Sequence, residues 1–404
     1  MNLFVIGAGC SKAYGESLSK QRMPVAKDFF NTFNQLDNLN TSRWVLVGNM
    51  VNALNMLKGT TPLDPFKNEY DIEEIHTMFE KKLFEAMDNE DISQIQLFFK
   101  AYTELVFLFS CVVNDIANGP VSKAHVNLAK YLSIDDSIIT FNWDVLLDRA
   151  LAEHTQWSPS NGYFIKPKSI FNSGWKDVEN VSPAQSPILL KMHGSANWLT
   201  GTITVKPGEK KFQMMQEVPA DTYYVYEHAN GPFDCWDGRW EKVYEPFVYG
   251  YYPPNLPLAG KKLDEGYTAV RMILRGPLHA PKGNHGSRGL VSMPLIIPPV
   301  KNKAYEFYGD LFDRIWSKAQ EEITRASVIT FIGYSFPITD TKTVKLFKDS
   351  FSKRASIPVI NVIDPEPDRI NNLLLFDLGI PESHINIFKE HFSEDFDLNR
   401  LKTK

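Results

Sequence analysis

Two strand-like runs of this 404-residue chain end in side chains suited to acid–base and hydrogen-bonding chemistry. Asn142 and Asp144 follow the apolar run 137–141, and His193 follows the run 187–192. An imidazole titrates near neutral pH and can act as a general base, while a carboxamide can hold a water or a sugar hydroxyl. Because ligands of open α/β sheets sit at the carboxyl ends of the strands, we expect these three side chains to meet at one ligand.

A glycine-rich turn follows the first strand-like run, at residues 3–6, with the sequence Gly7-Ala8-Gly9-Cys10-Ser11. Such a turn lets backbone amides approach a pyrophosphate at the N-terminus of a helix. We expect residues 12–15 to begin a turn or a helix. Gly7 and Gly9 match the first two glycines of the dinucleotide fingerprint, but Lys12 stands at the third position. No strand ending in an acidic residue follows about 20 residues later, which disfavours an ordinary dehydrogenase.

Two later strand ends carry residues of the same kind. Gly333, Tyr334 and Ser335 follow the run 327–331, and Asp364 follows the run 358–363. Glycine permits close approach of a ligand, and an acidic residue at a strand end is the usual acceptor for ribose hydroxyls. These residues therefore extend the candidate site along the sheet.

Each motif also has an ordinary structural explanation. The glycines can form a tight turn without a ligand, Asp144 can cap a helix that begins at Val145, and His193 can be a core histidine. Ser335 and Asp364 can be turn residues. The interpretation as one site depends on five strand ends of a single chain carrying such residues.

The runs that position these residues are short, apolar and rich in Ile and Val, which is typical of parallel strands buried on both faces. Helix-like segments at 145–152 and 307–325 lie between them, which indicates alternating β and α units. Helical spacing dominates from Pro24 to about Leu132. The segment from about 201 to 289 is instead dense in Tyr, Trp, Pro and Gly, and we expect an inserted, β-rich or irregular subdomain there.

Composition narrows the classes of function. The chain is 43% apolar and carries a net charge of −5 with mixed signs, which indicates a globular protein and disfavours nucleic acid as a direct partner. Its longest apolar run, 105–113, is far shorter than the roughly 20 residues that span a bilayer, so we expect no membrane helix. The three cysteines, Cys10, Cys111 and Cys235, cannot form a four-cysteine zinc site and fit a reducing, cytoplasmic compartment.

The ordered set GAGCS, FNWD, KMHGS, FIGYSF and VIDP resembles the sirtuin fold, and in particular the sirtuin-like NAD hydrolases of bacterial anti-phage defence. The motifs extend from residue 3 to about 370. The resemblance implies an α/β, Rossmann-like (sirtuin-type) parallel sheet built from residues 1–24, 120–200 and 291–404. A helical insertion would occupy 25–119, and a second, irregular or β-rich insertion would occupy 201–290.

The resemblance also implies that NAD is the substrate, that no metal is needed, and that NAD cleavage depends on Asn142 and His193, with Asp144 in support. The residues that would hold the dinucleotide are Gly7, Ala8, Gly9, Cys10, Ser11, Gly333, Tyr334, Ser335 and Asp364.

Two departures from the deacylating sirtuins favour water as the acceptor. Those enzymes carry a four-cysteine zinc module, which this chain cannot build, and a Pro-Asp-Phe-Arg loop, where residues 23–29 read MPVAKDF. We therefore predict an NAD hydrolase that releases nicotinamide and ADP-ribose and depletes cellular NAD. Alternatives are a non-catalytic sensor of NAD or an ADP-ribose derivative, and a zinc-free deacylase. Because uncontrolled hydrolysis would poison the host, we expect gating by a homo-oligomer, a HerA-type ATPase or a phage-derived activator.

Overall fold

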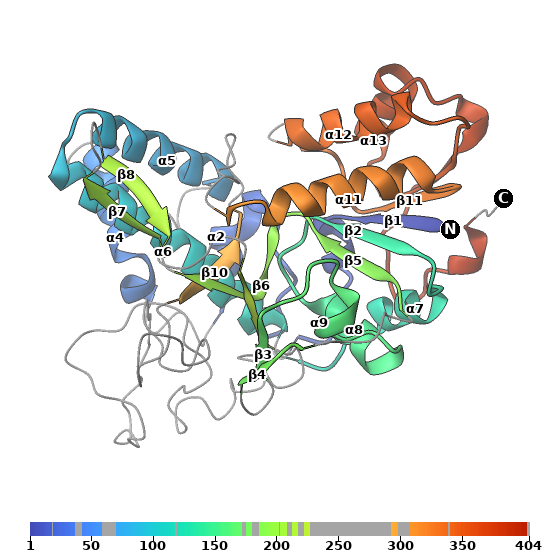
Figure 1. Cartoon of the computed structure of the whole chain (residues 1–404), viewed down its shortest axis with the longest axis horizontal. Helices are drawn as coiled ribbons and strands as arrows, with labels where there is room; N and C mark the ends of the chain where they lie inside the picture. Colours follow the sequence, from blue (N-terminus) through green and yellow to red (C-terminus); the bar gives the residue numbers. More distant parts are fainter. Residues whose placement is uncertain are drawn as a thin grey trace.

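The computed structural model of the chain describes residues 1–17, 19–36, 43–58, 70–117, 119–171, 175–179, 186–201, 203–207, 212–216, 222–226, 292–297, 308–337 and 340–401. Six parallel strands form its main sheet, in the order β13-β12-β11-β1-β2-β5 (Figure 1). Their bounds are β1 Asn2–Ile6, β2 Ser137–Thr140, β5 Ile188–Lys191, β11 Val328–Ile332, β12 Val359–Ile363 and β13 Ile385–Phe388.

Strand β1 lies at the centre of this sheet. Leu3 pairs with Ser137 of β2 on one side and with Ile329 of β11 on the other. The chain builds outward from β1 in one direction through β2 and β5, and later in the other direction through β11, β12 and β13. This is the doubly wound order, in which the carboxyl ends of β1 and β11 form the topological switch point where ligands bind.

The predicted Rossmann-like parallel sheet is confirmed. Each of the five predicted runs contains or overlaps a strand, and β2, β11 and β12 are buried over their whole length. Burial on both faces explains why these strands appear in the sequence as continuous apolar runs. The sixth strand, β13, was not predicted, because it is a short edge strand whose residues are all only partly buried.

Helices cover both faces of the sheet. Helices α7 (Lys123–Tyr131) and α8 (Leu146–His154) pack together on one face, and α11 (Leu311–Arg325) and α12 (Thr341–Ser352) pack together on the other (Figure 1). The helices predicted at 145–152 and 307–325 are thus present as α8 and α11. The short helical elements are α1 Ala8–Ser11, α9 Pro159–Gly162, α13 Asp368–Asn372, η4 Leu373–Asp377, η5 Glu382–His384 and η6 Leu398–Arg400.

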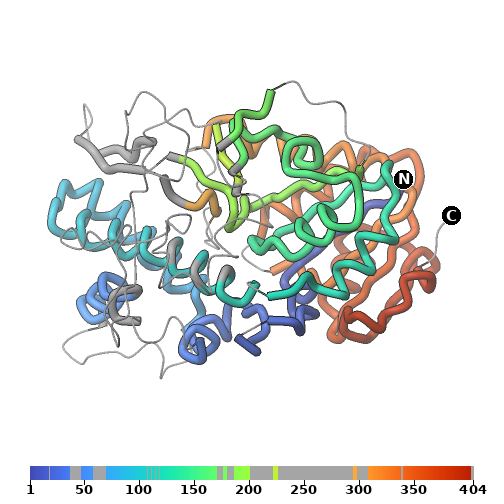
Figure 2. The backbone as a smooth tube through the Cα atoms, turned by 90° about the horizontal axis from the view of Figure 1, so that it is seen from below, coloured from blue at the N-terminus to red at the C-terminus, as the bar shows by residue number. Residues whose placement is uncertain are grey.

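A helical region lies beside the sheet, as Figure 2 shows from below. It comprises η1 Ala26–Asp28, α2 Phe29–Asn34, α4 Arg43–Lys58, α5 Ile72–Asp88 and α6 Ile92–Ala117. Helix α6 contacts both α4 and α5. Within the described residues it is also the one helix long and apolar enough to cross a membrane, and 69% of its most apolar window is buried inside the structure. The expectation that the chain has no membrane helix rests on the shorter apolar run 105–113, which forms part of α6.

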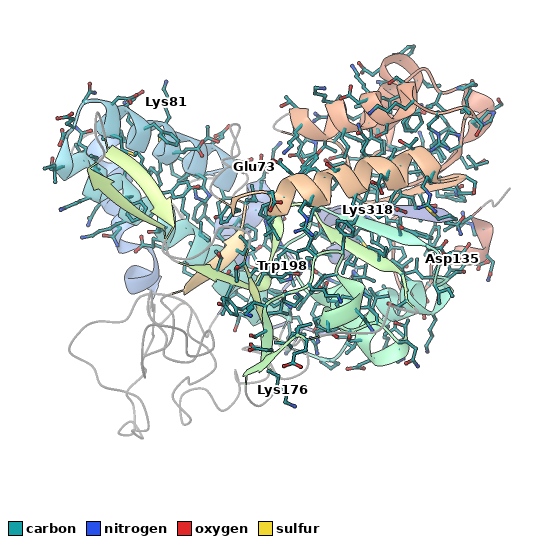
Figure 3. The ribbon with its side chains drawn as sticks, in the orientation of Figure 1. Glu73, Lys81, Asp135, Lys176, Trp198 and Lys318 are labelled. Atoms are coloured by element: carbon teal, nitrogen blue, oxygen red, sulfur yellow. The ribbon has the colours of Figure 1, made fainter. Side chains whose placement is uncertain are left out.

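A second sheet adjoins the helical region, with the strand order β10-β6-β9-β3-β4. Its strands are β3 Ser169–Phe171, β4 Trp175–Asp177, β6 Gly194–Gly201, β9 Tyr224–Tyr226 and β10 Ser292–Ile296, and a separate pair is formed by β7 Ile203–Pro207 and β8 Phe212–Gln216. Trp198 of β6 is 1% exposed and anchors this sheet (Figure 3). Strands β7, β8 and β9 lie in the predicted 201–290 insertion, most of which falls outside the described residues. The sheet joins strands from both sides of residue 201, and the domain limits stay a prediction.

Candidate active site

A cavity of about 410 Å³ lies at the carboxyl ends of β1, β2, β11 and β12. Residues that follow these strands supply much of its wall, together with His193 after β5. Other wall residues come from the segment after the glycine turn, from α5 and α6, and from the segment after β13: Met23, Pro24, Val25, Glu73, Phe109, Val113, His391 and Phe392. The cavity therefore lies at the switch point that the strand order defines.

Three glycines bring the ends of β1 and β11 into direct backbone contact. The amide of Gly7 donates to the carbonyl oxygen of Ile332 at 3.1 Å, and the amide of Gly9 donates to that of Gly333 at 3.0 Å. A Cβ atom on Gly9 would lie 2.7 Å from the Gly333 Cα, and Gly333 itself has a φ of +57°. These glycines are required by the close approach of two loops, so the tight-turn explanation applies alongside the ligand explanation.

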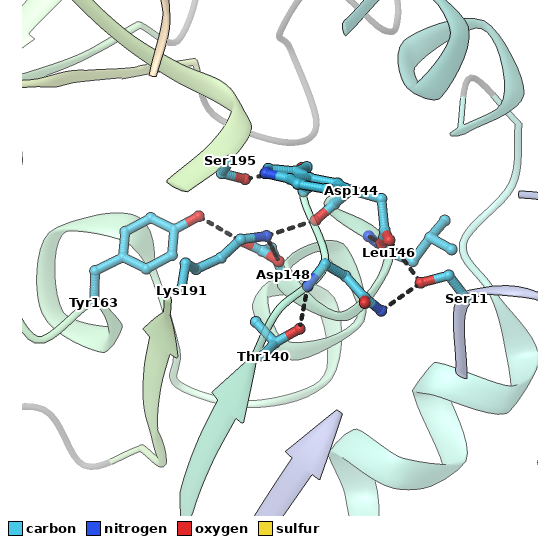
Figure 4. A network of polar contacts seen from close by, with 10 residues as sticks. Ser11, Thr140, Asp144, Leu146, Asp148, Tyr163, Lys191 and Ser195 are labelled. Carbon is cyan, nitrogen blue, oxygen red and sulfur yellow. Dashed lines mark hydrogen bonds and ion pairs between the residues drawn. The ribbon is translucent and has the colours of Figure 1, made fainter. Parts of the chain in front are cut away.

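The side chains of Ser11, Asn142 and Asp144 form one hydrogen-bonded group on the cavity wall (Figure 4). The Asn142 Nδ2 donates to the Gly7 carbonyl oxygen at 2.8 Å and to the Ser11 Oγ at 2.7 Å. The Ser11 hydroxyl donates to the Asp144 Oδ2 at 2.6 Å. The other Asp144 oxygen accepts from the amide of Leu146, the first residue of α8, at 3.0 Å, although the N-cap of this helix is Val145 and not Asp144. Asp144 thus supports both α8 and the cavity wall.

The imidazole of His193 lies on the same wall and is 3% exposed. Its ring lies 5.3 Å from the Phe141 ring and 6.1 Å from the Trp143 ring, measured between centroids. Its Nε2 lies 3.7 Å from the Asp340 Oδ1, and the other Asp340 oxygen accepts from the Tyr334 hydroxyl at 3.0 Å. A carboxylate at this distance stabilises a protonated imidazole and restricts its orientation.

The structure brings together most of the residues predicted for the site. Those that line the cavity are Gly7, Ala8, Gly9, Ser11, Asn142, Asp144, His193, Gly333, Tyr334, Ser335 and Asp364. Cys10 does not line it: its side chain is fully buried, and its Sγ lies 3.6 Å from the His125 Nε2. Burial, and secondarily Asp144, raises the pKa of the Cys10 thiol well above its usual value, so the thiol is a neutral packing group.

Turn chemistry is also visible at Asp364, whose Oδ1 accepts from the Glu366 amide at 2.8 Å. On the same wall, Tyr334 stacks on Phe141 with ring centroids 4.3 Å apart and planes 12° apart. This pair contributes an apolar, aromatic part of the cavity wall.

Asp340 and His391 are wall residues that the sequence analysis missed. Asp340 directly precedes α12, where an aspartate is ordinarily interpreted as a cap, so nothing in the sequence distinguishes it from one. His391 follows the unpredicted edge strand β13. Both assignments require the tertiary structure.

A buried lysine connects the two loops that carry Asn142 and His193 (Figure 4). Lys191, at the end of β5, is 1% exposed, and its Nζ donates to the Asp144 carbonyl oxygen at 2.5 Å and to the Asp148 Oδ2 at 3.3 Å. The Tyr163 hydroxyl donates to the other Asp148 oxygen. The amide of Ala196 also donates to the Trp143 carbonyl oxygen at 2.7 Å. The ends of β2 and β5 are therefore fixed relative to each other.

The chain matches no protein-family model and no curated protein sequence. Among solved structures it is similar to Sir2 bound to an acetylated peptide, with 11% identity, a TM-score of 0.34, and coverage of 97% of this chain and 88% of that one. A Sir2 homologue mutant in complex with ADP-ribose is 14% identical, with a TM-score of 0.30 and coverage of 90% and 80%.

Proposed function

We propose that this chain binds NAD in the cavity and hydrolyses its nicotinamide–ribose bond. One observation carries the proposal: Asn142 and His193 come from different strand ends, yet line the same cavity as the N-terminal glycines. A carboxamide that can hold a water or a hydroxyl and an imidazole that can act as a general base, both at a topological switch point, are groups that such a reaction can use.

In this mechanism the bond between C1′ and the nicotinamide nitrogen breaks, and its electron pair leaves with the neutral nicotinamide. The ribose gains positive charge, and the oxygen of one water forms the new bond to C1′ while its proton passes to His193. Asp340, 3.7 Å from the His193 Nε2, stabilises the imidazolium that forms. Product release and loss of that proton to solvent complete the cycle.

Asn142 is assigned to the reacting water or to a ribose hydroxyl. Its Nδ2 is already bonded to Gly7 and Ser11, so the carbonyl oxygen is the group that we assign to this contact. Asp144 acts through Ser11 and is a positioning residue. Holding water and ribose in a fixed geometry is a large part of the rate enhancement available to such a site.

The apolar part of the wall excludes bulk water from the reaction. Phe109 and Val113 of α6 line the cavity together with Phe141 and Trp143. Phe109 and Trp143 are in edge contact, with ring centroids 4.6 Å apart. A water-poor surrounding strengthens the electrostatic interactions of His193 and Asp340.

The biological setting of the proposal comes from the resemblance to anti-phage NAD hydrolases. In this setting the protein is a cytoplasmic effector that depletes NAD and is gated by self-assembly, by a HerA-type ATPase or by a phage-derived activator. The aromatic segment 201–290 and the helical region are the surfaces we assign to such contacts, because Trp and Tyr are enriched at interfaces.

The test is chromatography of NAD after incubation with the full chain, alone and with the products of neighbouring genes. We expect release of nicotinamide and ADP-ribose, and a loss of about 10²- to 10⁴-fold in rate for His193→Ala. His154→Ala is the matched control, since His154 is a partly exposed residue of α8 outside the cavity.

Different results identify the alternatives. ADP-ribose binding without nicotinamide release, under every activating condition, indicates a sensor. NAD-dependent conversion of an acetylated peptide indicates a deacylase. Cleavage by His193→Ala at the rate of the unmodified protein would remove His193 from the mechanism.

A further inference from the structure

The wall of the cavity has an unusual balance of charge for a site that receives a diphosphate. Among the wall residues in the described part of the chain, Lys12 is the only lysine or arginine. The same wall carries five carboxylates: Glu73, Asp144, Asp340, Asp364 and Glu366. The doubly negative pyrophosphate of a dinucleotide needs compensating charge or hydrogen-bond donors in such a surrounding.

The glycine turn offers little of this compensation. The amides of Gly7, Gly9 and Cys10 donate to the carbonyl oxygens of Ile332, Gly333 and Gly7, respectively. The hydroxyl of Ser11 donates to Asp144. Helix α1 has only four residues, so its dipole adds little to the attraction. Lys12, the one lysine or arginine on the described part of the wall, can supply the positive charge that attracts a diphosphate.

Lys12 directly follows this turn and is only loosely held. Its Nζ lies 3.3 Å from the Asp28 Oδ2, and the two side chains are 39% and 41% exposed. Exposed ion pairs of this kind contribute little to stability, so a ligand can displace one partner easily. The other Asp28 oxygen accepts from the Val25 amide at 2.6 Å, and Val25 itself lines the cavity.

We propose that Lys12 binds the diphosphate of the dinucleotide, and that Asp28 competes with the ligand for the same ammonium group. The inference takes the identity of the ligand from the proposed function, but its logic holds for any nucleoside diphosphate derivative. It assigns opposite effects to the two partners of one ion pair. Removing Lys12 weakens binding, whereas removing the charge of Asp28 strengthens it.

The experiment is calorimetric titration of the full chain with ADP-ribose, and separately with adenosine, at low and at high ionic strength. We expect Lys12→Met to weaken ADP-ribose binding about tenfold or more at low salt, with adenosine binding unchanged. We expect Asp28→Asn, which keeps an oxygen for the Val25 amide, to tighten ADP-ribose binding by up to about fivefold. Both effects should shrink as salt rises.

Lys27→Met is the matched control, because it removes the same charge from an exposed neighbour that does not line the cavity. We expect the ADP-ribose affinity of this variant to stay within about twofold of that of the unmodified protein. Unfolding temperatures equal to that of the unmodified protein would show that all three variants are folded.

The outcomes separate this inference from the proposed function. Unchanged ADP-ribose affinity in Lys12→Met, weaker binding in Asp28→Asn, or no ADP-ribose binding by the unmodified chain would overturn the inference, even if NAD is cleaved. Lys12-dependent ADP-ribose binding without any NAD cleavage would support the inference and reject the proposed function.

Discussion

The two ends of the six-stranded sheet bury the same kind of ion pair but use it differently. At the carboxyl end, Lys191 lies 3.3 Å from Asp148. At the amino end, Glu322 of α11 lies 2.8 Å from Lys318, and its other oxygen accepts from the Ser137 hydroxyl at the start of β2. Lys191 is 1% exposed, whereas the Lys318 side chain is 16% exposed.

The difference lies in what else each lysine holds. Lys191 also donates to the backbone of Asp144, in a loop that lines the cavity. Lys318 instead reaches a second carboxylate, that of the exposed Glu321, at 2.9 Å. A buried ion pair therefore does not by itself indicate a functional site. The candidate site lies where the loops after the strands converge, and the Lys191–Asp148 pair fixes the position of those loops.

The largest effect that tests this comparison is expected from Lys191→Met. It leaves the Asp148 carboxylate buried without its cation, which costs about 3–5 kcal/mol in the free energy of unfolding. Lys318→Met should cost about 1 kcal/mol or less, because Lys318 is partly exposed and Arg325 also lies 3.5 Å from Glu322. Urea denaturation of both variants measures the difference.

A double variant distinguishes loop positioning from general stability. Asp148→Asn combined with Lys191→Met removes both charges, so it should recover much of the lost stability. We still expect faster hydrogen exchange in peptides covering 141–147 and 193–198, with exchange in β11 unchanged, and a lower kcat for NAD with little change in KM. Exchange at the original rate in both peptides would contradict the positioning role.

Glu104 offers a third case, a buried carboxylate that no lysine or arginine pairs with in the described part of the chain. It is 5% exposed, and it accepts hydrogen bonds from the Asn49 side chain and the Met50 amide. Burial raises the pKa of Glu104 to about 7, against an ordinary value of 4.5. Because the pKa of Glu104 is higher in the folded than in the unfolded state, its carboxyl group contributes its full stabilisation below about pH 4.5. That contribution is lost as the pH rises through about 7.

The measured quantity is the difference in unfolding free energy, unmodified protein minus Glu104→Gln. We expect this difference to fall by up to about 3 kcal/mol between pH 4.5 and pH 8. Buried His76, with a pKa lowered to about 3, gives a slope of the opposite sign, but it is present in both proteins and cancels. A flat difference across this range would show that Glu104 is ionised at little cost.

The carboxyl end of the sheet was largely predictable from the sequence, because a parallel strand and the residue after it leave a local pattern. The runs 137–141 and 358–363 each contain their strand, and Asn142 and Asp364 follow directly. The cavity wall then follows from topology, since parallel strands end at one edge.

The partners of these residues were not predictable in the same way. Asp340 lies near His193 across a long sequence separation, and the position of Lys191 in the KMHGS sequence does not indicate its buried contacts. Burial and pairing of single charged side chains leave no periodic pattern in a sequence. Most of 201–290 lies outside the described residues, and the prediction made for it rests on composition.

The smallest effect concerns two glycines with the same backbone conformation. Gly333 follows β11 at the carboxyl end, with a φ of +57°, and Gly379 precedes β13 at the amino end, with a φ of +65°. Alanine costs about 1–2 kcal/mol at either position for the left-handed conformation. At Gly333 its Cβ would also lie 2.5 Å from the backbone of Gly9, whereas at Gly379 it would meet nothing within 4 Å.

We therefore expect Gly333→Ala to destabilise the protein by about 1–3 kcal/mol more than Gly379→Ala. Gly333→Ala should also weaken ADP-ribose binding, since the loops that form the cavity are forced apart, while Gly379→Ala should bind as the unmodified protein does. Thermal unfolding and calorimetric titration of the two variants measure both differences. Equal destabilisation with equal binding would mean that the close contact between the β1 and β11 loops relaxes freely, and that the switch point owes its geometry to other contacts.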